Sequence, residues 1–125
     1  MTARTRPEEC CERPVACAPL PKRPRTALVE MFKALSDPTR LEIFRLIAAQ
    51  PAPLCACDVV DRFHLRQPTI SHHLAVLRDA GLIDTQRRGV WAYYSVRAEG
   101  LALLRTATET LAPAACCATA CCKEP

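Results

Sequence analysis

The sequence lacks several features that would assign it to common protein classes. No apolar run approaches the roughly 20 residues of a membrane helix, and no apolar segment of a secretory signal follows the basic N-terminus. It has no glycine-rich phosphate-binding loop, no Ser-His-Asp grouping, and no cysteine and histidine placed as nucleophile and base. These absences predict a cytoplasmic protein that has no membrane partner and is not an enzyme.

Cysteine is unusually frequent in this chain. Nine cysteines in 125 residues, without a secretory signal, argue against a closed disulfide framework. Thiols in a reducing compartment are more often metal ligands or redox switches, although a lone cysteine can equally be a small buried hydrophobe. Adjacent cysteines favour a ligand role more strongly, and they occur at 10–11, 116–117 and 121–122.

Length and proline content predict one domain between two short arms. Residues 1–24 hold five prolines among charges and alanines, which predicts a flexible Cys/Pro-rich arm without regular helix. Residues 112–125 form a second, Cys-rich tail, so the domain spans 25–111. Lys and Arg exceed Asp and Glu by 17 to 13, which permits nucleic-acid binding without requiring it.

The spacing of apolar residues predicts a mainly α-helical domain with one β-hairpin. Helices are expected at 25–35, from Pro38 to before Pro51, at 57–63, at 68–80 and at 98–111, and strands at 82–86 and 91–96. Asp37 is the expected N-cap of the second helix, and Gly81 the expected stop of the fourth. Val59, Val60 and Phe63 are expected to face inward. The apolar sides of the other helices are Leu28, Met31, Phe32 and Leu35; Leu41, Ile43, Phe44, Ile47 and Ala48; Ile70, Leu74 and Leu77; and Leu101, Leu104 and Leu111.

Helices 57–63 and 68–80 have the spacing of a helix-turn-helix motif, in which the second helix enters the major groove of DNA. Its N-terminal end carries Gln67, Thr69 and Ser71, and Pro68 and His72 lie opposite the apolar stripe at about 100° per residue. Glutamine can pair with adenine, and serine can bind bases or phosphate. A polar, solvent-facing surface on an ordinary helical domain is the alternative interpretation.

The hairpin adds a second candidate DNA contact. Arg87 and Arg88 stand beside Gly89, which permits a tight turn. Arginine at such a tip suits phosphate or minor-groove contact.

Four segments together resemble the ArsR/SmtB family of metal-responsive repressors: FKALSDPTRLEIFRLI, LCACDVV, QPTISHHLAVLRDAGLI and RRGVWAYYSV. The resemblance covers about 28–105. It implies a winged helix-turn-helix fold, a homodimer through the first and last helices, and binding to double-stranded operator DNA with an inverted repeat. By motif position it implies DNA-facing roles for Gln67, Pro68, Ser71 and His72.

Two residues of the turn depart from the family pattern. His64 and Arg66 stand where the family often has glycine and serine. Histidine tolerates a positive φ better than most residues, and the loss of serine removes a helix cap. Arg66 could add a phosphate contact.

The segment 55–58, Cys-Ala-Cys-Asp, resembles the LCVCDL box of thiolate-sensing family members, in which it supplies two metal ligands. Residues 9–11, Glu-Cys-Cys, resemble the arm of an arsenic-sensing branch. The resemblance therefore implies an ion site of Cys10, Cys11, Cys55 and Cys57. Thiolates are soft ligands that select soft ions, and the start of a helix is expected to lower the pKa of Cys57. The family's other site type uses imidazole on the last helix, and 98–111 contains no histidine.

These features predict a repressor of an arsenic-resistance operon. It would bind its operator as an ion-free dimer and leave it when trivalent arsenic or antimony binds the thiolates, with no organic cofactor. The alternatives are a cadmium- or lead-responsive repressor with the same site, a thiol redox-switch regulator, and a cysteine-rich metal carrier. The C-terminal cysteines are a candidate second metal site or an ion-scavenging tail: Cys116, Cys117, Cys121 and Cys122.

Overall fold

The computed structural model describes residues 19–111. They form helices and a three-stranded antiparallel sheet in the order α1 (Lys22–Leu35), α2 (Pro38–Ala48), β1 (Leu54–Cys55), α3 (Ala56–Phe63), α4 (Gln67–Asp79), β2 (Ile83–Arg88), β3 (Trp91–Val96) and α5 (Ala98–Thr110). The predicted mainly helical fold with a β-hairpin is confirmed. No helix between residues 19 and 111 is long and apolar enough to cross a membrane.

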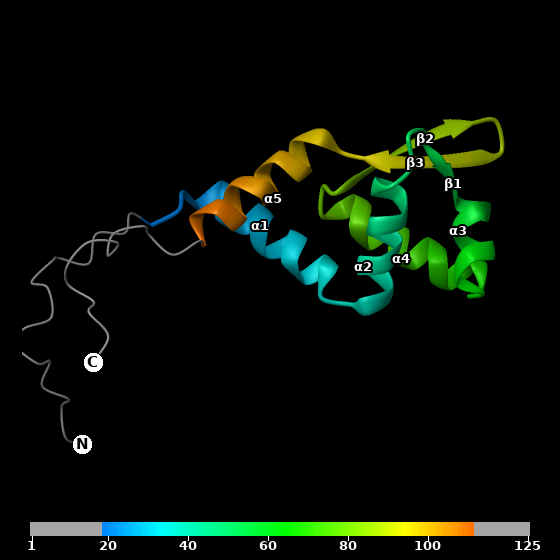
Figure 1. Cartoon of the computed structure of the whole chain (residues 1–125), viewed down its shortest axis with the longest axis horizontal. Coiled ribbons are helices and arrows are strands. Elements are labelled where there is room, and N and C mark those ends of the chain that lie inside the picture. The colour runs from blue at the N-terminus through cyan, green and yellow to red at the C-terminus, as the bar shows by residue number, and fades with distance from the viewer. Residues whose placement is uncertain (1–18, 112–125) are drawn as a thin grey trace, which may run out of the picture.

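The helices and strands lie toward two opposite ends of the domain (Figure 1). Helices α1 and α5 contact each other at one end, whereas α3 and the β2–β3 hairpin lie at the other. Helices α2 and α4 lie between the two ends. The predicted helix-turn-helix and hairpin are therefore at the end away from α1 and α5.

Helix α4 runs through the core. Ile70, Leu74 and Leu77 have no exposed surface, which confirms the predicted stripe, and Ile43 and Val59 pack into the same cluster. Four residues of the other predicted apolar faces are exposed: Phe32, Leu41, Ala48 and Leu111. Helical periodicity finds an apolar face, but it does not say whether the chain's own core covers that face.

The first helix starts earlier than the proline content suggested. It begins at Lys22, so residues 22–24 of the predicted arm are helical and that part of the prediction was wrong. Pro24 is tolerated because the first backbone N–H groups of a helix have no partner within it. Asp37 caps α2 as predicted, accepting a 2.9 Å hydrogen bond from the backbone N–H of Arg40.

The turn between α3 and α4 has the conformation that its sequence predicted. His64 adopts a left-handed conformation with φ of 53° and ends α3. Arg66 precedes α4 and makes no side-chain capping bond, as the missing serine implied.

The sheet contains a strand that the apolar pattern did not predict. Strand β1 pairs with β3, so that Cys55 lies opposite Tyr93. Gly89, with φ of 63°, opens a two-residue hairpin turn, and Arg87 and Arg88 belong to β2 instead of the turn. A positive φ at the first turn residue matches the twist of paired strands, which explains why the turn follows the arginines.

Candidate functional site

The N-terminal end of α4 is the most open part of that helix. All five residues predicted to face DNA there are exposed: Gln67, Pro68, Thr69, Ser71 and His72. The buried stripe anchors the helix on its opposite side, so these side chains project away from the core. The helix dipole adds a partial positive charge at this end, which attracts phosphate.

The hairpin carries two exposed arginines on opposite faces of β2. The guanidinium of Arg88 lies 5.1 Å from the ring centre of Tyr93, a cation–π contact that restrains it. Arg87 alternates to the other face, towards α3 and α4. Val90 and Trp91 complete the tip with 87% and 55% of their surfaces exposed, an apolar pair that the sequence reasoning did not identify as functional.

The two cysteines of the 55–58 segment lie at a strand-to-helix junction. Cys55 ends β1 and is 7% exposed, whereas Cys57 is the second residue of α3 and is exposed. The two sulfurs and a carboxylate oxygen of Asp58 all lie within 4.8 Å of one another. The pairing of β1 with β3 holds Cys55 in place, so two of the four predicted ion ligands are brought together.

The charge state of Cys57 differs from the expectation. A hydrogen bond with Cys55 raises the pKa of Cys57, and desolvation and the negative charge of Asp58 add to this increase. The expectation that the helix start would lower this pKa was wrong, because these neighbours outweigh a backbone hydrogen bond that lowers it. The ion-free pair therefore favours the protonated thiol.

A groove of about 360 Å³ connects the thiols to the exposed N-terminal end of α4. Cys55 and Cys57 line one side, Gln67 and Ser71 another, and Arg87 of the hairpin a third. Trp91 also lines the groove, beside Val90. The predicted sensing and DNA-facing residues thus share one surface depression.

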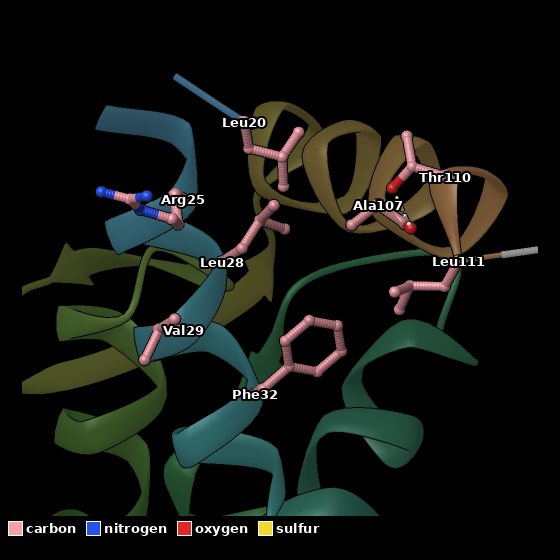
Figure 2. A pocket seen from close by; sticks show the side chains of 8 residues that line it. All are labelled: Leu20, Arg25, Leu28, Val29, Phe32, Ala107, Thr110 and Leu111. Carbon is pink, nitrogen blue, oxygen red and sulfur yellow. Dashed lines mark hydrogen bonds between the residues drawn. The ribbon is translucent and has the colours of Figure 1, made fainter. Parts of the chain in front are cut away.

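A second hollow, of about 150 Å³, lies on an apolar surface formed by α1 and α5. Figure 2 shows Leu28 and Phe32 of α1 and Ala107 of α5 around this hollow, with Leu111 at the end of α5. Phe32 is 42% exposed and Leu111 is 74% exposed. Phe32 and Leu111 belong to the apolar faces predicted for these two helices.

The other six predicted metal ligands are not among the described residues. Cys10, Cys11 and the four tail cysteines lie outside the described residues. His72 is exposed and His73 is half-buried, and neither belongs to the cluster around Cys55.

Comparison with known proteins places this architecture in a family. Residues 37–85 match the model "Bacterial regulatory protein, arsR family". An arsenical resistance operon repressor of Staphylococcus xylosus is 42% identical over 74 residues, which is 59% of this chain and 69% of that protein. An uncharacterized HTH-type transcriptional regulator of Methanocaldococcus jannaschii is 43% identical over 67 residues, 54% of this chain and 74% of that protein.

The fold comparison agrees with the sequence comparison. The structure of HlyU from Vibrio cholerae matches with a TM-score of 0.58 and 25% identity, over 70% of this chain and 95% of that one. These relatives are regulators and not enzymes, which confirms that prediction and the predicted family. The chain belongs to the arsR family of bacterial regulatory proteins.

Proposed function

We propose that this protein represses an arsenic-resistance operon and leaves its operator when trivalent arsenic or antimony binds its cysteines. The observation that carries the proposal is the cluster of Cys55, Cys57 and Asp58, whose two cysteines line the groove beside the exposed end of α4. The name of the Staphylococcus xylosus relative, an arsenical resistance operon repressor, supports arsenic as the signal.

The chemistry of the thiol pair is compatible with arsenite. Arsenous acid exchanges each hydroxyl for one thiol sulfur and releases one water, so three thiols and three hydroxyls give three As–S bonds and three waters. The thiol protons leave in the water, and a raised pKa at Cys57 is therefore no obstacle. Cys55 and Cys57 provide two sulfurs, and Cys10 or Cys11 of the N-terminal arm would provide the third.

The DNA-binding surface in this proposal combines α4 and the hairpin. Gln67, Thr69, Ser71 and His72, with Pro68, would face the major groove. Arg87 and Arg88 would contact the phosphate backbone or the minor groove. All seven side chains are exposed, and Gln67, Ser71 and Arg87 line the same groove, which supports this assignment.

We further propose that two copies pair through α1 and α5, which would place two α4 helices on an inverted repeat. The support is the apolar surface of Val29, Phe32 and Leu111, which are 45%, 42% and 74% exposed. Phe32→Glu should convert the dimer to monomer in sedimentation and weaken operator binding. Lys33→Glu, at an exposed position of the same helix, is the control; equal dimerisation of both variants would contradict this pairing.

One observation supports a second candidate inducer. The carboxylate of Asp58 lies beside the two sulfurs, and an oxygen ligand suits a divalent ion such as cadmium or lead better than arsenic. Cadmium or lead is therefore the alternative inducer at the same site. The tail cysteines remain proposed as a second metal site.

The central test replaces both sensing thiols in the full chain. The double variant Cys55→Ser/Cys57→Ser should bind operator DNA like the parent and should not release it in arsenite, measured by fluorescence anisotropy. Cys17→Ser, which removes the one cysteine assigned to neither proposed metal site, is the control and should still release. Antimonite, cadmium, lead, zinc and the oxidant diamide are compared in parallel. Normal arsenite release by the first variant would refute the site.

A further inference from the structure

The groove that contains Cys57 lies where a winged helix-turn-helix must pass over one strand of DNA. The start of α4 enters the major groove, and a hairpin tip reaches the backbone or the adjacent minor groove. The sugar-phosphate strand separates these two grooves. It must therefore run between Gln67 and Ser71 on one side and Arg87 on the other, and these three residues line the groove.

The charges around the groove favour a phosphate near Arg87 and the start of α4. Arg87 contributes a full positive charge, and the N-terminal ends of α3 and α4 both contribute partial positive charge. Asp61 also lines the groove, and its carboxylate opposes a phosphate. The favourable position for the strand is therefore between Arg87 and the start of α4.

We propose that the DNA backbone and an ion on the thiol pair occupy this one groove, so that DNA and inducer exclude each other directly. Cys57 is exposed in the same groove as Gln67 and Ser71. An ion bound to Cys55 and Cys57 there fills space that the strand needs. The DNA is then released because the ion and the DNA backbone compete for the groove of each protomer. Any change in the relative position of the two protomers would add to this effect. This inference rests on the proposed function for the identity of the inducer.

The first experiment tests whether bound DNA occupies the groove beside Cys57, and no ion is added. The full-length protein is alkylated with N-ethylmaleimide, alone and with a duplex selected in vitro for binding, and each cysteine is followed by mass spectrometry. With DNA at a hundred times its Kd, alkylation of Cys57 should slow by about 100-fold. Cys121 and Cys122 serve as internal controls and should react at nearly unchanged rates. Equal rates for Cys57 in free and bound protein would overturn the shared groove.

The second experiment distinguishes exclusion from long-range coupling. The operator Kd is measured as arsenite is raised far above its own Kd. Direct exclusion makes the operator Kd rise without a ceiling, because no complex contains both ligands. Coupling through conformation gives a plateau, typically about 5- to 150-fold. A plateau accompanied by a complex of protein, DNA and arsenic in native mass spectrometry would overturn the proposal.

A separate measurement tests whether arsenite is the inducer. Trp91 is the chain's single tryptophan and lines the groove, so its emission should change when arsenite binds. Unchanged emission and an unchanged operator Kd would refute arsenite as the inducer. The alkylation result would then decide by itself whether the strand occupies the groove beside Cys57.

Discussion

Replacement of Gly100 by alanine tests the tightest backbone contact in the fold. Gly100 lies in the first turn of α5, and a Cβ built on it would collide with the carbonyl oxygen of Gly81. Gly81 ends α4 with φ of 81°. The backbone N–H of Arg97 also donates a 2.9 Å hydrogen bond to the carbonyl of Leu82, so the start of α5 is tied to this turn.

The expected magnitude combines two opposing effects. Real Cβ atoms essentially never come closer than 3.0 Å to such a neighbour, so α5 and the turn must move apart. Such overpacking costs about 1 to 3 kcal/mol, and an obstacle made of backbone belongs at the upper end of that range. Alanine gains about 1 kcal/mol over glycine in a helix. Gly100→Ala should therefore lower the free energy of unfolding by about 2 kcal/mol.

The assay is urea unfolding followed by circular dichroism at one fixed protein concentration. Ala102→Gly, at an exposed position of α5, measures the helix-propensity effect alone and should cost about 1 kcal/mol. If Gly100→Ala increased stability by the amount that Ala102→Gly loses, the close approach of α5 to Gly81 would be refuted.

Two further predictions concern helix ends. His64→Gly should raise the free energy of unfolding by about 1 kcal/mol, because glycine adopts the left-handed conformation without the steric cost that a Cβ incurs. Ala49→Gly, at a right-handed helix end, should lower it, and stabilisation by both would contradict the reasoning. For Asp37, the hydrogen bond from the Arg40 backbone holds its pKa below the usual 3.8. The parent's stability advantage over Asp37→Ala should be complete above pH 3.8 and should shrink as the pH falls through that lower pKa; a pH-independent difference would contradict the capping role.

Local sequence patterns determined most of the secondary structure. The stripe of Ile70, Leu74 and Leu77 predicted α4 because a helix that buries one face must repeat apolar residues at its own period. Asp37 and Gly81 marked helix ends because their side-chain chemistry or lack of a Cβ suits those positions. The family resemblance followed from the same segments, and the comparisons confirm it.

Only the tertiary structure decided which residues share a site. Strand β1 is two residues long, and only its pairing with β3 holds it, so no periodicity could reveal it. That pairing places Cys55 against the sheet and opens one groove to Cys57, Gln67 and Arg87, which belong to three different elements. The raised pKa of Cys57 has the same origin, since it depends on which groups surround the sulfur. The period of the sequence identifies the apolar face of each element, whereas burial of that face and proximity between elements depend on how the elements pack.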